Sequence, residues 1–342
     1  MRNRLQNGHV VTLADVAKRA GVSASTASRA LNGRGELSDQ TRAAVAEAAR
    51  VLQFQPSQLA RSLRTSTTHT VGFVVPDVSS PFYAAALKGA QTTLHDAGYR
   101  TLLMDCEQSA EREVEALQTL LAHRVDGLLI STVGLDRAEF EHVTGGRLPC
   151  VFFDSSIVGA GDGSVILDNN TGIELLVDHL VEHGHRRIGL LAGSPSETSG
   201  FERRAGFESA MARHAPQVEI AGIAGTEWSL REGQRATREL LDLDEPPTAL
   251  VSSSVELALG AMVACRELGV RIPGDLALAT FDDAYFAELL DPPLTAVTYK
   301  PREVGEAAAN LLVEAMRDDE PGRRDVSFEV QLVVRGSCGC ER

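Results

Sequence analysis

The stretch VTLADVAKRAGVSASTASRALNG, residues 11–33, decides how the N-terminal part of the chain folds. Thr12 followed by Asp15 is typical of a helix N-terminus, and apolar residues then recur at helical spacing. The first glycine of the stretch supplies a sharp turn, and Ser23 is placed to cap a second helix. A third helix is expected after Ser38. Three short helices with a glycine turn between the first two match the helix-turn-helix plan, whose second helix lies in the major groove of DNA.

Charge is distributed unevenly along the chain of 342 residues, whose formal net charge is −14. Residues 1–65 contain ten Lys or Arg and four Asp or Glu, so this segment carries +6 and the remainder −20. A basic N-terminal segment on an acidic body indicates that only this segment contacts a polyanion such as nucleic acid.

The outward residues of the second helix suit contacts with DNA, because they are small or hydrogen-bonding and include one guanidinium: Ala24, Ser25, Ser28 and Arg29. An Arg side chain can pair with O6 and N7 of guanine. Hydroxyl and amide groups near helix ends can hold phosphates, as expected of Thr12, Thr26 and Asn32. On these residues alone, a generic helical hairpin with a solvated polar face is the alternative.

The same stretch resembles the headpiece of the lactose-repressor (LacI/GalR) family of bacterial transcription regulators. The family pattern, roughly T-hydrophobic-x-D-V-A-x-x-A-G-V-S-x-x-T-V-S-R-x-L-N, is matched nearly throughout, with Ala27 where valine is usual. The resemblance implies a DNA-binding regulator, expected to act as a repressor on a roughly palindromic operator. It adds Leu13, in the first helix, to the candidate DNA contacts.

Residues 54–65, FQPSQLARSLRT, match the family's hinge, a short helix that forms only on DNA and pairs with that of a second subunit. A helix of about eight residues is too short to be stable alone, so it needs burial against a partner or DNA. Leu63 matches the leucine that enters the minor groove, and Arg64 would meet the DNA backbone or groove. A plain linker is the alternative.

From residue 70 onward, short apolar runs alternate with helical stretches, and the alternation resumes after a glycine-rich break at 159–163. Apolar strands that are each followed by a helix indicate parallel sheets covered on both faces. Two such series predict two lobes with a ligand cleft between them. We therefore expect a helix-turn-helix headpiece at 1–55, a hinge at 56–66 and a two-lobed α/β core at 67–342. Within the core, we expect the first lobe to consist of about 70–160 plus about 295–320. The second lobe would consist of about 161–294 plus about 321–342.

Segments such as RIPGDLALATFDD also resemble the sugar-sensing core of this family, which has the type I periplasmic-binding-protein fold. Matching motifs imply that the ligand residues are Ser80, Phe82, Asp154, Arg203, Trp228, Ser254 and Asp282. Carboxylates and a guanidinium suit a polyol, and aromatic rings stack on its C–H face. The alternatives are structural: turn caps for the aspartates, core positions for the rings and a surface charge for the arginine.

Three departures from the family pattern leave the class of effector open. Ser254 and Val255 stand where Asn-Asp is common, Thr280 replaces a glycine, and Ser80 replaces an asparagine. A sugar or sugar derivative is the expected effector, and a purine stacked between aromatic rings is the alternative. A ligand-binding protein without a DNA role is a more remote alternative, since the core alone would support it.

No motif of an enzyme active site stands out, and no apolar run reaches the length of a membrane span. The N-terminus lacks the features of an export signal, so a cytoplasmic protein is expected. The C-terminal tail lacks the leucine heptad that makes tetramers in some relatives, so a homodimer is expected.

The five cysteines are scattered and do not suggest a disulfide framework. Cys338 and Cys340 form a C-x-C pair, and two thiols without a second Cys/His pair nearby do not complete a tetrahedral zinc site. Free thiols without metal or cofactor are therefore expected. A metal or redox role is the alternative for this pair, as is a metal pair for His183 and His185.

Overall fold

The computed structural model describes residues 11–33, 35–54, 67–146, 148–317 and 322–340. The chain divides into two compact units, residues 1–68 and 69–342. The predicted hinge at 56–66, with Leu63 and Arg64, lies outside the described residues. No described helix combines the length and the apolar character needed to cross a membrane.

The described part of the N-terminal unit contains three helices, α1 (Leu13–Ala20), α2 (Ala24–Leu31) and α3 (Asp39–Val51). Thr12 and Asp15 form a capping box at α1, and Ser23 and Ser38 cap the next two helices as predicted. Gly21 ends α1 at φ +69°, a left-handed conformation that favours glycine. The small core that holds the three helices together consists of Val16, Ala17, Ala27, Val45 and Ala48.

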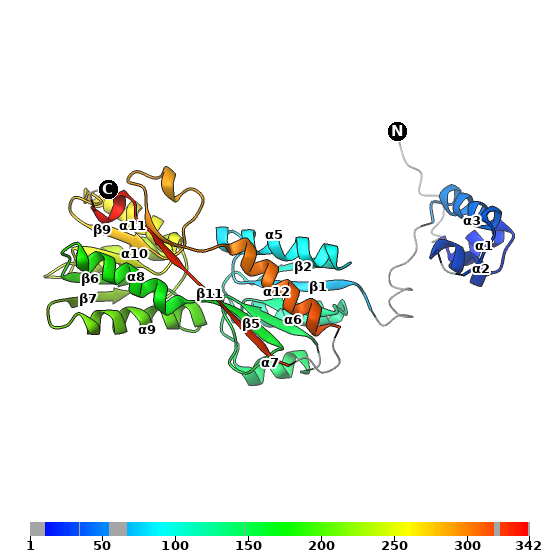
Figure 1. The fold of residues 1–342 in the computed structure, drawn as a ribbon, viewed down its shortest axis with the longest axis horizontal. Helices are drawn as coiled ribbons and strands as arrows, with labels where there is room; N and C mark the ends of the chain where they lie inside the picture. The colour runs from blue at the N-terminus through cyan, green and yellow to red at the C-terminus, as the bar shows by residue number, and fades with distance from the viewer. Residues whose placement is uncertain (1–10, 34, 55–66, 147, 318–321, 341–342) are drawn as a thin grey trace. The chain divides into compact units, whose positions relative to one another are not determined.

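The first lobe of the core unit is built on a six-stranded sheet in which every pairing is parallel (Figure 1). Its strands lie in the order β11-β5-β4-β3-β1-β2, with bounds β1 (Thr70–Val75), β2 (Arg100–Asp105), β3 (Gly127–Ile130), β4 (Cys150–Phe153), β5 (Gly163–Leu167) and β11 (Arg324–Phe328). The helices are α5 (Pro81–Asp96), α6 (Ala110–Ala122), α7 (Arg137–Thr144) and α12 (Pro301–Ala315). Side chains of α5 and α12 cover one face of the sheet, and those of α6 and α7 cover the other.

Helices α5 and α12 pack closely because each has a glycine at the crossing. A Cβ atom on Gly305 would lie 1.9 Å from the carbonyl oxygen of Ala86, and one on Gly89 would lie 2.0 Å from that of Arg302. Any side chain at either position would therefore push the two helices apart.

The second lobe repeats this plan with the strand order β12-β10-β9-β8-β6-β7, in which only β12 runs antiparallel to its neighbour. The strands are β6 (Arg187–Leu191), β7 (Glu219–Ala224), β8 (Ala249–Ser252), β9 (Ala277–Thr280), β10 (Thr295–Thr298) and β12 (Gln331–Val333). Helices α8 (Asn169–Glu182) and α9 (Thr198–Arg213) cover one face, and α10 (Leu230–Leu241) and α11 (Val255–Leu268) cover the other. Short 3-10 helices lie at Ala287–Leu289 (η1) and Gly336–Cys338 (η2).

The predicted lobe boundaries are wrong at three strands. The glycine-rich break at 159–163 leads into β5, which lies between β4 and β11 in the first sheet and does not open the second lobe. Strand β10 belongs to the second sheet and β11 to the first, the reverse of the expectation. The chain thus passes between the lobes after β5, after β10 and after β11. Apolar runs locate strands along the chain, but the choice of sheet depends on pairing between strands that are distant in sequence.

Candidate functional site

A pocket lies between the two lobes of the core. All seven ligand residues predicted from the sequence line it, and they come from both lobes: Ser80, Phe82, Asp154, Arg203, Trp228, Ser254 and Asp282. The remaining lining residues were not predicted: Pro76, Asp77, Tyr83, Gln108, Glu197, Ser199, Glu256 and Tyr299. The predicted set therefore lies together around a single cavity.

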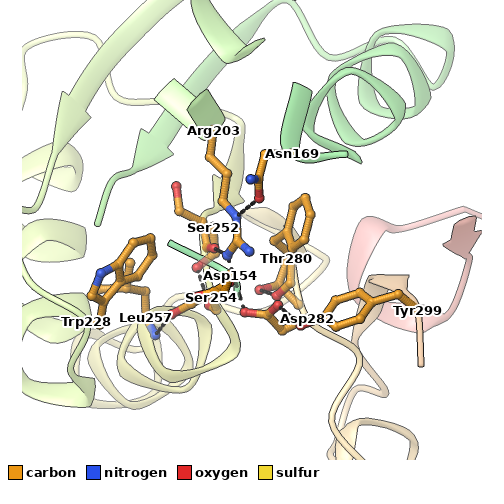
Figure 2. Close-up of polar contacts among 12 residues, drawn as sticks. Asp154, Asn169, Arg203, Trp228, Ser252, Ser254, Leu257, Thr280, Asp282 and Tyr299 are labelled. Atoms are coloured by element: carbon orange, nitrogen blue, oxygen red, sulfur yellow. Dashed lines mark hydrogen bonds and ion pairs between the residues drawn. The ribbon is translucent and has the colours of Figure 1, made fainter. Parts of the chain in front are cut away.

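Arg203 of α9 lies at the centre of the polar network and is only 3% exposed (Figure 2). Its Nε donates to Asn169 Oδ1 at 2.8 Å and its Nη1 to the Ser253 carbonyl at 2.6 Å. Its Nη1 also lies 3.5 Å from Asp282 Oδ2, and its Cζ lies 3.7 Å from the ring centre of Phe281. Burial alone would lower the pKa of this guanidinium, but the carboxylates of the pocket outweigh burial and raise it. The structural alternative for Arg203, a surface charge, is excluded by its burial.

Asp154 and Asp282 follow β4 and β9, at the ends of strands where the two sheets face the pocket. Both have left-handed backbones, with φ of +61° and +72°, which are strained for residues other than glycine and concentrate at functional sites. Each carboxylate accepts a hydrogen bond from a tyrosine: Tyr83 Oη donates to Asp154 at 2.8 Å, and Tyr299 Oη donates to Asp282 at 2.6 Å. Burial raises the pKa of Asp154 to about 6, although Arg203 opposes this shift.

Trp228 connects the pocket wall to a buried acid. Its Nε1 donates to Glu197 Oε1 at 2.8 Å, and its six-membered ring lies directly against Gly193, where a Cβ atom would be 2.1 Å away. Burial and the neighbouring Asp154 raise the pKa of Glu197 to about 8. At neutral pH Glu197 is therefore mostly protonated and carries a hydrogen-bond donor as well as acceptors.

Glu256 contributes an acceptor that the protein leaves unused. Its Oε1 is buried and has no hydrogen-bond partner among the described residues. Burial and the charge of Asp282 raise its pKa. Ser254, two residues earlier, caps α11 by accepting from Leu257 N at 3.3 Å. Val255, which stands where the family commonly has an aspartate, is 2% exposed and does not line this pocket. The neighbouring Glu256 lines it instead.

Polar contacts join the two lobes at two places. Gln108, which follows β2, donates to the Trp228 carbonyl at 3.0 Å and accepts from Trp228 N at 3.3 Å. Thr198, at the start of α9, donates through Oγ1 to the Ser156 carbonyl at 2.9 Å and through its N–H to Ser155 Oγ at 3.0 Å. These bonds hold the lobes in the relative position seen in the structure.

The predicted DNA contacts within the described residues lie on α1, α2 and the residues that flank them. Ala24, Ser25 and Arg29 are exposed on α2, and Thr12 is exposed at the start of α1; Leu13, Thr26, Ser28 and Asn32 are partly buried. Ser23 Oγ lies 2.9 Å from the hydroxyls of both Ser25 and Thr26, and Asn32 Nδ2 donates to the Ser28 carbonyl at 2.7 Å. An exposed N-terminal turn of α2 with backbone N–H groups suits a phosphate or a base edge.

Sequence reasoning missed Tyr83, Gln108, Glu197, Glu256 and Tyr299. Tyr83 and Glu256 were within reach, because each lies one or two residues from a predicted pocket residue on the first turn of a helix. Tyr299 lies in the segment that passes between the lobes after β10, and Gln108 reaches across from the other lobe. No local pattern marks these two, because their role depends on how the lobes face each other.

The fold and the two sites define a class of protein: a helix-turn-helix unit joined to a two-lobed core with a small-molecule pocket, as in transcription regulators that respond to an effector. Residues 12–57 match the family described as "Bacterial regulatory proteins, lacI family", and residues 177–338 match "Periplasmic binding protein-like domain". The chain is also 31% identical to the HTH-type transcriptional repressor CytR of Escherichia coli (strain K12), across 95% of this chain and 96% of CytR.

Solved structures agree with this classification. The lac repressor dimer bound to operator and the anti-inducer ONPF has a TM-score of 0.83 at 28% identity, covering 96% of this chain and 99% of that one. The complex of the transcriptional regulator CelR with cellobiose has a TM-score of 0.70 at 29% identity, with coverage of 96% and 99%. The chain belongs to the lacI family of bacterial regulatory proteins and is a DNA-binding transcriptional repressor. Its relatives are repressors and not enzymes.

Proposed function

We propose that this repressor acts as a homodimer whose affinity for operator DNA is modulated by a neutral, hydroxyl-rich ligand, a sugar or sugar derivative, bound between the lobes. The observation that carries the proposal is the excess of acceptors in the pocket. Five of its lining residues bear carboxyl groups, Asp77, Asp154, Glu197, Glu256 and Asp282, whereas Arg203 provides the only guanidinium or ammonium group among the lining residues.

The partners of Arg203 explain why a neutral ligand is favoured. The guanidinium donates to Asn169 and to the Ser253 carbonyl, and the carboxylate of Asp282 beside it balances its positive charge. An anionic ligand would meet like charges without a free cation, which is unfavourable in a buried site. Hydroxyl groups, by contrast, donate to carboxylates, and the unpartnered Glu256 Oε1 is suited to accept one.

For DNA, we propose that α2 enters the major groove, with Arg29 reading a base and Ala24 and Ser25 close to base edges. Thr12, Leu13, Thr26, Ser28 and Asn32 would fix the position of the headpiece on the backbone. A dimer would place two such helices in successive major grooves of a roughly palindromic operator, with Leu63 and Arg64 of each hinge at its centre. The lac repressor, which this chain resembles in fold, is a dimer on its operator.

Ligand and DNA would be coupled through the angle between the lobes. A ligand that binds one lobe arrangement more tightly shifts the protein toward that arrangement and thereby changes its affinity for DNA. DNA changes the affinity for the ligand by the same factor. The polar contacts that Gln108 and Thr198 make between the lobes stabilise the one arrangement that the structure has, and a ligand that breaks or strengthens them would change its population.

A purine is the second candidate, favoured by the aromatic side chains of the lining. Phe82 and Trp228 present rings at the pocket, and the carboxyl groups of Asp154 and Glu197 are suited to the N–H edges of a base. A neutral nucleobase meets the same electrostatic requirement as a neutral sugar.

Trp228 is the only tryptophan of the chain and lines the pocket, so its emission reports on ligand directly. Purified protein is titrated with neutral monosaccharides and disaccharides, the matching sugar phosphates, and purine bases. The proposal expects a saturable change with one neutral sugar, a much weaker response to its phosphate, and loss of the response in Asp154→Asn but not in the exposed Glu182→Gln. A response only to purines supports the second candidate, and a response only to phosphates contradicts both.

Operator binding is tested separately by selecting sequences from a random duplex library and measuring their affinity against salt. A repressor that contacts phosphates loses affinity linearly in log–log with added salt, because counterions are released. A flat response would contradict the DNA-binding role.

A further inference from the structure

The C-terminal C-x-C pair lies against a histidine that the sequence places far away. Cys340 Sγ lies 3.2 Å from His179 Nε2, although the two residues are 161 positions apart. His179 belongs to α8, whereas Cys338 ends η2. The donor atoms of His179, Cys338 and Cys340 all lie within 4.8 Å of one another. The sequence-based argument that the two thiols lack a Cys/His partner therefore does not hold in the folded chain.

We propose that His179, Cys338 and Cys340 form a binding site for a thiophilic divalent cation of the zinc type. With Zn–S bonds of about 2.3 Å and Zn–N bonds of about 2.0–2.1 Å, tetrahedral ligands lie about 3.5–3.8 Å apart. The three donor atoms, at mutual distances up to 4.8 Å and as short as 3.2 Å for one pair, bracket these values. Small side-chain rotations are sufficient to bring them around one ion.

The donor set selects among metals. Two sulfurs and one imidazole favour zinc and related soft or borderline ions over magnesium or calcium, which require oxygen ligands. Cys338 is 1% exposed and His179 is 8% exposed, so these two ligands are held by the core, while Cys340 is partly exposed.

The surroundings are organised to hold the ligands in place. The segment that carries both cysteines is fixed to the second sheet, since Ser337 Oγ donates to the Leu278 carbonyl at 2.6 Å and accepts from Thr295 N at 2.8 Å. On α8, the ring of His183 lies 4.4 Å from that of His179, and His183 Nδ1 lies 2.7 Å from the His179 carbonyl. A bound ion would link the C-terminal segment to α8, the helix that begins the second lobe.

The test uses tag-free, full-length protein kept reduced with a phosphine, with Zn²⁺ and Co²⁺ as probes. The proposal expects about one zinc per chain after dialysis, a thiolate-to-cobalt charge-transfer band with Co²⁺, and a higher unfolding temperature with zinc. His179→Gln and Cys340→Ser should each weaken zinc binding by at least about tenfold and remove the zinc-dependent rise in unfolding temperature. His95→Gln and Cys106→Ser, which alter a histidine and a cysteine outside the cluster, should leave both unchanged.

Two results would overturn the proposal. The first is a folded, reduced wild-type protein that binds less than about a tenth of an equivalent of zinc and gives no charge-transfer band with cobalt. The second is a zinc affinity that stays the same in His179→Gln and Cys340→Ser. A Cys338–Cys340 disulfide that forms in air, combined with no zinc binding after reduction, would replace the metal site with a redox pair. The cobalt spectrum of the wild type does not depend on whether any variant folds.

Discussion

Replacing Glu197 by Gln should remove a large part of the pH dependence of core stability. Glu197 is 2% exposed, and its pKa is raised from an ordinary value of 4.5 to about 8, chiefly by burial and then by the charge of Asp154. Gln has nearly the same shape, and its amide oxygen can still accept from Trp228 Nε1. The substitution therefore removes the titration while keeping the hydrogen bond.

The sign and the size of this change in stability follow from the difference between the pKa values of Glu197 in the folded and unfolded states. A carboxyl group whose pKa is higher in the folded state than in the unfolded state binds its proton more tightly when folded, so its contribution to stability is complete below pH 4.5 and is lost as the pH rises through 8. Each pH unit between these limits is worth about 1.4 kcal/mol. At pH 6, about two units below the folded pKa, Glu197 therefore contributes about 2–3 kcal/mol that is absent at pH 9.

Urea unfolding of wild type and Glu197→Gln at pH 6 and pH 9 provides the assay, with the free energy of unfolding as the measured quantity. The wild type should lose about 2–3 kcal/mol more than the variant between these two pH values. The exposed Glu182→Gln serves as a matched control and should keep the wild-type pH dependence. A difference between wild type and Glu197→Gln that is the same at both pH values would refute the reasoning.

Three other substitutions test the headpiece, the lobe contact and the helix packing. Arg29→Ala should weaken operator binding by about 1–3 kcal/mol and relax specificity at one base pair, measured by anisotropy on single-site operator variants; equal losses on all sequences would mean that Arg29 contacts only phosphate. Gln108→Ala removes two hydrogen bonds between the lobes and should destabilise the joined arrangement of the lobes by about 1–3 kcal/mol. The expected readout is a red shift of tryptophan emission, which the control Gln118→Ala should not produce. An unshifted spectrum argues against the contact. Gly305→Ala places a methyl group 1.9 Å from a carbonyl oxygen of α5 and should lower the free energy of unfolding by about 1–3 kcal/mol or more. In the control Gly322→Ala, the added methyl group meets no atom within 4 Å. Equal urea midpoints for the two variants would contradict the close packing.

Most of the fold could be predicted because its signals are local. The capping residues Thr12, Ser23 and Ser38 begin α1, α2 and α3, and each apolar run of the core coincides with a strand. The allocation of strands to lobes was not local. Strand β11 joins β5 in parallel after a long excursion of the chain through the second lobe, and nothing in the sequence of either strand names its partner.

The residues of the candidate ligand pocket that have a local signal could be predicted, and those that depend on contacts between the lobes could not. Asp154 and Asp282 follow strands and are recognisable by position, because strand ends meet at one edge of a parallel sheet. Gln108 and Tyr299 depend on the approach of two lobes, which no periodicity encodes. The C-x-C pair shows the opposite case: its motif is visible in the sequence, but its neighbour His179 becomes visible only once α8 and the C-terminal segment pack together.

Tyr299 explains how a ligand in this pocket would influence the angle between the lobes. It lies between β10 of the second lobe and α12 of the first, on one of the segments that connect them, and its hydroxyl donates to Asp282. A ligand hydroxyl that binds Asp282 Oδ1 would share this acceptor with the hydroxyl of Tyr299. Because α12 packs closely on α5 through glycines, a shift of the connecting segment is expected to carry these two helices together. Under the proposed function, a ligand that moves Tyr299 would couple its binding at Asp282 to the position of the lobes, and through that position to DNA affinity.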